Sequence, residues 1–509
     1  MALPNVKVNV GEQTLVAANT QIPFIPAVLL KTKSGPIGTV ETITSEAQFK
    51  AIFGESDYTT PSAYAIQTYL RSYSYVLVTR LANETVAALG TGLMQFTPEA
   101  EEGQTVDPID LISAKTDYKT DLFNGKEIKL VYDGAAHKLW LDVSALVGKN
   151  TISIKEDFMA DTATAVDLEE TLNKLVASIN AANLGITLES EFINKLASDT
   201  VPSVDAYIDG FSMYVQGGDS GNETNLDASK VKEAIDLYDV PDRFIDVMVI
   251  PEYPGYEVVN YATALALKDN FVVLATPNGT SVTEILQNVA TYDVENRGSL
   301  ALYFPNVYYN NFKDNEGNLQ AIPACIAVLH AYAKTDINAK WGAPAGVSRG
   351  NLTLVNSLEV QLSTDDLTRL YDNIIPINGI NDISGKGFVV WGNKTATSTS
   401  DFFDRINISR LVKYVTKQAY LISWDYLFEP ITLDLFSSWS SRVEAMLDLI
   451  KIGNGVSDFE VIMDSSINTD ATIAANQLNG IIRIKPLEVA EFVNIDLTIT
   501  DTISVSVEG

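Results

Sequence analysis

Two short stretches of the sequence contain residue types that could perform nucleophilic catalysis. Residues 216–222 read QGGDSGN and residues 134–138 read GAAHK, which together resemble the nucleophile and base motifs of trypsin-type serine proteases. Such catalysis needs a serine, a histidine and an aspartate in one hydrogen-bonded set beside an oxyanion hole. The first hypothesis to weigh is therefore that Ser220 is a nucleophile and His137 its base.

The surroundings of both stretches argue against a protease. Trypsin-type proteases are usually disulfide-bearing double barrels, whereas this chain has a single cysteine, and Asn222 stands where a second glycine is expected. His137 lies between LVYDGA and KLWLDV, which predicts two strands joined by an Asp-Gly turn, with His137 on the second strand. We therefore expect no catalytic residues and no enzyme activity.

The glycine pair Gly217-Gly218 allows a second chemistry, phosphate binding. The following stretch LDASKVKEAIDLYDV predicts a helix with Asp227 or Ser229 as its N-cap. Its apolar stripe is Val231, Ala234, Ile235 and Tyr238. A glycine-rich loop before a helix can hold phosphate, but this loop lacks the lysine and spacing of a P-loop and the pattern of a dinucleotide site. A structural turn is favoured, and an α/β enzyme that binds a phosphate or nucleotide is a distant alternative.

Metal and cofactor sites have few candidate ligands. The chain has two histidines, one cysteine and no H-E-x-x-H motif, and the acidic loop 312–320 (FKDNEGNLQ) does not match EF-hand spacing. We interpret that loop as a solvated turn. Cys325 lies in the apolar stretch AIPACIAVLHAY and is expected to be a small buried hydrophobe. No metal and no cofactor are expected.

Composition restricts the partners. Lys and Arg number 35 against 65 Asp and Glu, so the net charge is −30 and the sequence pI is near 4.4. That field repels phosphate backbones, which excludes nucleic acid as the main partner. The sequence has no run of 18 apolar residues and no signal-peptide pattern, so we expect no membrane insertion and synthesis in a reducing cytosol.

The elements along the chain predict an α/β multidomain protein, α+β overall, since 509 residues exceed the size of one core. Residues 24–80 read as a compact α/β piece with a Thr44-Ser45 helix start, and strands alternate with helices again after about 206. Residues 89–205 contain short strands and acidic loops, which suggest an inserted, mostly β domain. Its one helix has a single apolar face, made of Leu168, Leu172, Leu175, Val176 and Ile179.

Two helices mark the last third of the chain, SRLVKYVTKQAYLISW from Ser409 and LFSSWSSRVEAMLDLIKIG ending at Gly453. The second has an apolar stripe that predicts core packing: Phe436, Trp439, Val443, Met446, Leu447 and Ile450.

The two chain ends show the strongest period-two alternation, which is typical of strands with one buried face. The alternating apolar residues are Val6, Val8 and Val10 at the start, and Ile495, Leu497, Ile499, Ile503, Val505 and Val507 at the end. These extended β arms either pair within their own chain or add to the sheet of a neighbouring subunit. Periodicity alone leaves both alternatives open.

The order of these pieces and several short strings resemble the contractile tail sheath family of bacteriophages and related contractile injection systems. The most specific strings are FVVWGNKT, INISRLV, FEP and IKPLEVAEFV. The residues that carry the resemblance there are Trp391, Gly392, Lys394, Thr395, Arg410, Glu429, Pro430 and Glu491. Further matches are GAPAG at 342–346 and AYAKTD at 331–336, where Lys334 replaces an arginine of the family pattern.

The resemblance implies a division of the chain into domains. These are an N-terminal arm (1–22), a subtilisin-like but non-catalytic α/β domain (23–88 and 206–390), an inserted outer domain (89–205), an inner C-terminal domain (391–492) and a C-terminal arm (493–509). The terminal arms would be strands lent to neighbouring subunits.

The resemblance also implies a function. The chain would form stacked six-fold rings around a tail tube and contract to drive the tube through a host cell envelope. Implied partners are other copies of the chain, the tail tube protein, and the baseplate and tail terminator proteins. The implied location is the virion tail, assembled in the bacterial cytoplasm. Another self-assembling structural array protein is the main alternative.

Overall fold

The computed structural model describes residues 24–96, 109–147, 155–159, 165–182, 184–191, 211–222, 226–240, 243–253, 255–292, 298–398 and 402–491. They fall into two compact units. The α/β unit contains the described residues up to 340 and those of 344–414, and the C-terminal unit contains 341–343 and 415–491. The sequence placed the start of the C-terminal domain at 391, and the predicted domain boundaries stay predictions.

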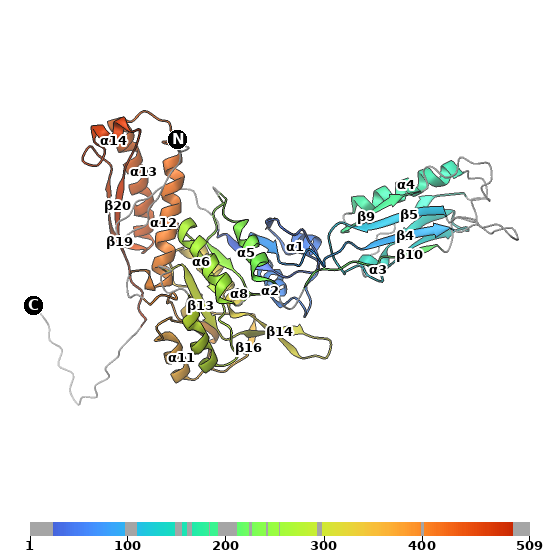
Figure 1. Cartoon of the computed structure of the whole chain (residues 1–509), viewed down its shortest axis with the longest axis horizontal. Helices are drawn as coiled ribbons and strands as arrows, with labels where there is room; N and C mark the ends of the chain where they lie inside the picture. Colours follow the sequence, from blue (N-terminus) through green and yellow to red (C-terminus); the bar gives the residue numbers. More distant parts are fainter. Residues whose placement is uncertain are drawn as a thin grey trace, which may run out of the picture. The chain divides into compact units, whose positions relative to one another are not determined.

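An eight-stranded sheet forms the centre of the α/β unit (Figure 1). Its strands, in spatial order, are β18 (Gly387–Trp391), β17 (Asn378–Ile383), β13 (Leu300–Phe304), β12 (Val272–Ala275), β11 (Val247–Val249), β1 (Pro26–Leu30), β3 (Val76–Arg80) and β2 (Glu41–Ile43). Neighbours from β17 to β3 pair in parallel, and β18 and β2 add antiparallel edges. Strands β1, β3 and β11 to β13 are buried throughout, as expected of the apolar strands of a covered parallel sheet.

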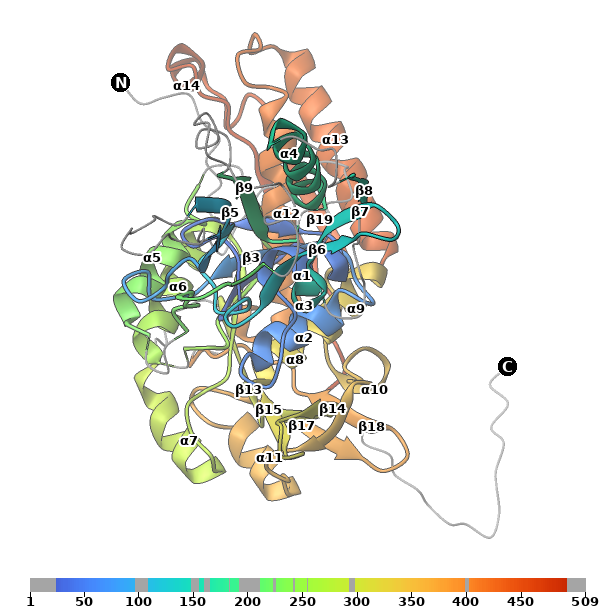
Figure 2. The ribbon, with the colours of Figure 1, turned by 90° about the vertical axis from the view of Figure 1, so that its right-hand side faces the viewer.

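Helices cover both faces of this sheet. One core cluster contains Val28 and Leu30 of β1 and the other Ala27 and Leu29, because successive strand residues point to opposite faces. The first face is covered by α1 (Glu46–Phe53), α2 (Pro61–Tyr69), α8 (Ala324–Ala327) and α9 (Leu329–Asn338). The second is covered by α5 (Ala228–Asp236), α6 (Tyr256–Asp269), α7 (Val282–Asn288) and α11 (Thr364–Tyr371). Figure 2 shows α5 and α6 on one side of β3 and α1 and α2 on the other. The predicted α/β class is confirmed.

Two helices begin at N-cap residues that the sequence predicted. Ser45 Oγ accepts the Gln48 amide at α1, and Asp227, rather than Ser229, is the N-cap of α5. The acidic loop 312–320 joins β14 (Val307–Lys313) to β15 (Leu319–Ile322), and β16 (Val355–Leu358) completes their three-stranded sheet. Asp314 Oδ1 accepts the amides of Glu316 and Asn318, so the loop is a turn held by its own carboxylate.

The region after β3 has a core of its own. One sheet has the order β10 (Ser212–Tyr214), β6 (Glu127–Asp133), β7 (Lys138–Asp142) and β8 (Glu156–Asp157). The other contains β4 (Thr91–Phe96), β5 (Ile109–Thr116) and β9 (Ile186–Ser190). Helix α4 (Ala165–Ala181) buries the predicted stripe into this core, and a short α3 (Ser144–Val147) follows β7. We call residues 91–214 the inserted region.

The placement of His137 on a strand was wrong. The β6–β7 hairpin forms as predicted, but Lys138 is the first residue of β7 and His137 lies in the turn with a φ of 50°. The turn places His137 in the left-handed region because the chain must reverse in the few residues between Asp133 and Lys138.

The C-terminal unit is built on α13 (Leu433–Ile452) and the antiparallel pair β19 (Val456–Ile462) and β20 (Ile481–Pro486). All six residues of the predicted stripe on α13 are buried, which confirms its core role. Trp341 packs against Gly453 and Gly455, and its indole N–H donates to the Gly453 carbonyl at 2.8 Å. A short helix α14 (Asp470–Ala474) lies between the strands in sequence.

Helix α12 (Ile406–Trp424) belongs to both units and begins three residues before the predicted Ser409. No described helix has the length and apolar character that a membrane crossing requires. The predicted arm strands, with Val6, Val8, Val10, Ile495, Leu497, Ile499, Ile503, Val505 and Val507, lie outside the described residues.

Candidate functional site: two buried junctions

The QGGDSGN stretch is the return path of the chain from the inserted region. It pairs antiparallel with the outgoing path, through bridges between Ala88 and Asp219 and between Thr91 and Gln216. These two paths, residues 82–91 and 215–222, are named the neck. The predicted structural turn is thus part of the segment that leads from β10 to α5, and this segment pairs with the one that leads from β3 to β4.

Gly218 of the neck lies so close to the backbone of Thr120 that only glycine fits at this position. Its amide donates to Asn124 Oδ1 at 3.0 Å, and Asn124 Nδ2 donates back to its carbonyl at 2.7 Å. A Cβ at this position would lie 2.0 Å from the Thr120 carbonyl oxygen, well inside contact distance. The glycine therefore serves close backbone packing.

Arg80, the last residue of β3, ties the neck to the sheet. Its Nη1 donates to the carbonyls of Gly35 at 2.6 Å and Lys119 at 2.9 Å, and its Nη2 donates to the carbonyl of Ser220 at 2.6 Å. The side chain is buried, and burial lowers its pKa to about 10. Ser220 thus contributes a backbone acceptor to a structural junction.

No hydrogen bond joins Ser220 to His137, both of which are described, and His137 Nδ1 has no partner within the described residues. The structure does not assemble the catalytic set that the two sequence motifs suggested. The other potential nucleophile, Cys325, is fully buried, and burial raises the pKa of its thiol to about 12. A thiol with that pKa is protonated and unreactive at neutral pH.

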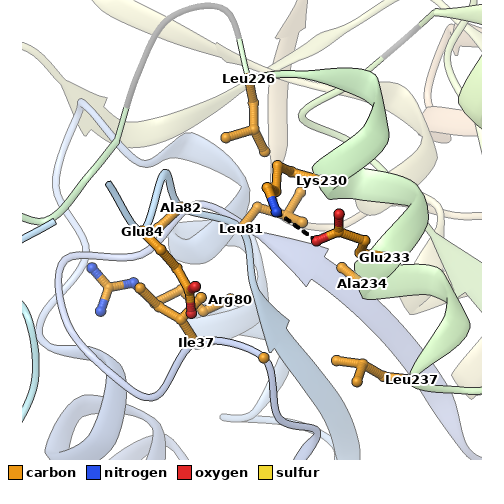
Figure 3. Close-up of a pocket in the computed structure, with 11 residues that line it drawn as sticks. Ile37, Arg80, Leu81, Ala82, Glu84, Leu226, Lys230, Glu233, Ala234 and Leu237 are labelled. Carbon is orange, nitrogen blue, oxygen red and sulfur yellow. Dashed lines mark hydrogen bonds and ion pairs between the residues drawn. The ribbon is translucent and has the colours of Figure 1, made fainter. Parts of the chain in front are cut away.

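A cavity of about 250 Å³ lies between the end of β3 and α5 (Figure 3). Its walls are mainly apolar and include Leu81, Leu226 and Leu237. Lys230 Nζ donates to Glu233 Oε2 at 2.7 Å, so the nearby cation is neutralised, and the Arg80 guanidinium points away from this pair. The two cations that line the cavity are already engaged, Lys230 with Glu233 and Arg80 with backbone carbonyls, and Gly217 and Gly218 do not line it. Among the described residues no group of His, Cys, Asp and Glu could hold a metal.

The predicted motif around Trp391 folds into a clamped loop at the end of β18. Asn378 of β17 donates through Nδ2 to the carbonyls of Leu302 and Lys394, and its Oδ1 accepts the Lys394 amide. A Cβ on Gly392 would lie 2.5 Å from that oxygen, so the clamp requires glycine there. Trp391 itself is 48% exposed.

Lys394 and Thr395 extend the clamp to neighbouring elements. Lys394 Nζ donates to the Tyr371 carbonyl at 2.9 Å, and Thr395 Oγ1 donates to the Phe403 carbonyl at 2.7 Å. Asn393 Nδ2 donates to Asn407 Oδ1 of α12 at 2.8 Å. The loop is therefore joined to the start of α12.

Arg410 of α12 is the centre of a second buried junction. It forms an ion pair with Asp336 of α9, and its guanidinium lies 4.9 Å from the ring centre of Tyr332. Lys340 Nζ lies 3.3 Å from Asp336 and 3.5 Å from Asp246, the residue before β11. The four charged side chains, called the ion cluster, are two cations and two carboxylates, and each is at most 14% exposed. Burial lowers the pKa of Arg410.

Glu429, Pro430 and Glu491 lie in the C-terminal unit. Glu429 and Pro430 are exposed in the connection between α12 and α13, next to Phe428, which is 86% exposed and has a φ of 68°. Glu491 is partly buried beyond β20. Sequence reasoning missed Asn378, Asp246 and Lys340; a lone aspartate before the apolar run DVMVI was the available signal for Asp246.

Comparison with known proteins supports the resemblance inferred from the motifs. The chain is 30% identical over 295 residues to the tail sheath protein of Vibrio phage KVP40, covering 57% of this chain and 42% of the relative. It is 27% identical over 310 residues to the tail sheath protein of Enterobacteria phage T4, covering 60% and 45%. The region of this chain that matches thus covers less than half the length of each of these curated relatives. No family model matches.

Solved structures of sheath proteins share the fold at low sequence identity. A sheath complex of an extracellular contractile injection system in its contracted state aligns with a TM-score of 0.55 and 12% identity, over 98% of each chain. The sheath tail protein of Desulfitobacterium hafniense aligns with a TM-score of 0.56 and 10% identity, over 91% of this chain and 94% of that one. The arrangement of mixed helices and several sheets is therefore that of contractile sheath proteins.

Proposed function

We propose that the chain is the structural subunit of a contractile tail sheath. It polymerises as stacked six-fold rings around a tail tube and shortens to drive the tube through a cell envelope. The observation that carries this proposal is the combination of 27–30% identity to phage tail sheath proteins with a sheath-like fold over nearly the whole chain.

Assembly through the terminal arms is supported by the C-terminal unit. The β19–β20 sheet has only two strands among the described residues, so each strand has an edge with no described strand beside it. Two-stranded sheets are marginal alone and accept further strands through backbone hydrogen bonds. The alternating residues at 6–10 and 495–507 have the pattern of donor strands. We propose that arms of neighbouring subunits extend this sheet.

The partners follow from the same proposal. The copies of the chain bind each other, the tail tube protein lies inside, and baseplate and terminator proteins cap the ends. A baseplate of an anti-feeding prophage is among the structures with this fold. The exposed side of α13 in 433–452 is our proposed tube-facing surface. The protein acts mechanically, without catalysis, metal or cofactor, and functions in the virion tail after assembly in the bacterial cytoplasm.

Contraction requires a metastable extended state, held by a kinetic barrier and released by a trigger at the baseplate. The net charge of −30 adds repulsion between copies, which salt screens. We therefore expect polymerisation to strengthen as ionic strength rises.

Deletion of residues 493–509 tests the arm mechanism. The truncated chain is expected to keep the circular dichroism and melting behaviour of the full chain but to sediment as small species where the full chain polymerises. The matched control is Thr498→Ser, which keeps the alternating pattern and should polymerise normally. Normal tubes from the truncated chain would refute the role of the C-terminal arm.

A further inference from the structure

The ion cluster contacts the chain just before β1. Asp246 Oδ2 accepts the backbone N–H of Ile25 at 2.9 Å, and Ile25 directly precedes β1. The same carboxylate is paired with Lys340. Ile25 is the second described residue, three positions after the end of the predicted arm of 1–22.

The cluster also lies next in sequence to the places where the chain passes from one unit to the other. Lys340 is the last residue of the α/β unit before Trp341, which packs into the C-terminal unit against Gly453. Arg410 lies on α12 four positions before Tyr414, the last residue of the α/β unit. Between residues 336 and 415, each point where the chain changes from one unit to the other is therefore within about five residues of Lys340 or Arg410 in sequence.

Simple stabilisation does not account for this arrangement. Four charges buried together cost desolvation, and apolar residues of similar volume stabilise such sites equally well or better. Buried ion pairs instead impose one geometry, because a misplaced partner leaves a charge uncompensated. The paired charges of Arg410, Asp336, Lys340 and Asp246 fit a role in positioning.

We propose that the ion cluster is a clamp that fixes the base of the N-terminal arm relative to α9 and α12. This deepens, and rests on, the proposed sheath function, because a strand lent to a neighbour transmits force only if its base is held. In this account Asp246 is the central positioning residue. It joins the arm base to Lys340, and Asp336 joins Lys340 to Arg410.

Hydrogen exchange of the full-length Asp246→Ala variant tests the clamp at low protein concentration. We expect exchange of the peptide covering 24–30 to accelerate roughly tenfold or more, because a hydrogen bond to a charged acceptor is lost. The peptide covering β12 (272–275) should be unchanged. Asp239→Ala, which removes the exposed partner of Lys268, is the matched control and should leave both peptides unchanged.

The charge itself is tested by Asp246→Asn, which keeps an acceptor for Ile25 and removes one of the two carboxylates that pair with Lys340. Faster exchange at both 24–30 and 336–343 is expected. Unchanged exchange at 24–30 in both variants, or a uniform acceleration across the sheet, would overturn the clamp.

The assembly consequence is measured separately. The Asp246→Asn chain should need a several-fold higher concentration than the unmodified chain to polymerise, by sedimentation. Local loosening with unchanged polymerisation would refute the mechanical role while leaving the structural clamp in place. If the unmodified chain never polymerises, the sheath proposal fails, and the exchange result still decides the clamp.

Discussion

The two buried arginines show two different ways of joining parts of a chain. Arg80 donates to three backbone carbonyls, of Gly35, Lys119 and Ser220, and no carboxylate pairs with it in the described neck. Arg410 pairs with a carboxylate and lies over an aromatic ring. Both side chains are at most 6% exposed.

The difference is between hydrogen-bond geometry and charge balance. At the neck, the planar guanidinium fork reaches several carbonyls at once, so the shape of the donor matters most. At the ion cluster, cations and carboxylates pair with one another, so loss of one carboxylate breaks buried ion pairs. The folding stability contributed by the neck should therefore depend on whether residue 80 is arginine or lysine. The stability contributed by the ion cluster should depend on the presence of each carboxylate.

The largest effect is expected from Asp336→Ala. Removing this carboxylate takes away the ion pair that Asp336 forms with the buried Arg410, and breaking a buried ion pair typically costs about 3–5 kcal/mol of folding stability. Chemical denaturation of the purified variant measures the loss. The matched control is Glu460→Ala, whose partner Arg483 is exposed, and about 0–1 kcal/mol is expected there. Equal losses in the two variants would contradict the account of the ion cluster.

Substituting lysine for each arginine sharpens the comparison. Arg80→Lys replaces the fork with a point donor that cannot reach all three carbonyls, and we expect a loss of about 2–3 kcal/mol. Arg410→Lys keeps the charge opposite Asp336 and should lose less than Arg80→Lys. Urea denaturation of both variants shows which one loses more folding stability. A larger loss in Arg410→Lys than in Arg80→Lys would show that charge, rather than the shape of the guanidinium, matters at the neck too.

A methyl group in the neck tests its close packing. Gly218→Ala places a Cβ 2.0 Å from the Thr120 carbonyl oxygen and should cost about 1–3 kcal/mol, because backbone cannot move aside cheaply. Faster proteolysis at residues 82–91 and 215–222 is the expected local sign. Gly134→Ala is the control, since its Cβ would meet ordinary contact at 3.5 Å. Loss of stability in the control alone would contradict this packing.

His330 is a buried titratable group on α9 that pairs with no carboxylate among the described residues. It lies edge-on to Tyr69 and Tyr73, and burial lowers its pKa to about 4. Because the unfolded histidine binds a proton near pH 6.5 and the folded one does not, stability should fall as the pH drops from 6.5 towards 4.

Between pH 7 and pH 5 the expected loss from His330 is about 1–2 kcal/mol. The His330→Phe variant removes the group, so its denaturation midpoint should depend less on pH than that of the unmodified chain. Parallel pH dependence of the two proteins would show that folding does not lower the pKa of His330.

Local patterns in the sequence predicted the elements well but not the junctions. The stripe on α13 and the Ser45 cap follow from spacing within a few residues, so they were visible. Asn124 and Gly218 lie 94 positions apart, and Ile25 and Asp246 lie 221 apart. No local periodicity encodes such pairs, so the neck and the ion cluster could not be predicted. The predicted motif residues remain candidates, and the Asn378 clamp, which the sequence did not reveal, accounts for Gly392 and Lys394.

The central claim is that this chain assembles a sheath by itself through contacts between copies. Negative-stain electron microscopy of the purified full-length protein across salt and protein concentration tests it most directly. The account predicts hollow cylinders or stacked six-fold rings, more abundant at higher ionic strength. Dispersed single particles under all conditions, including after addition of an assembled tail tube, would contradict it.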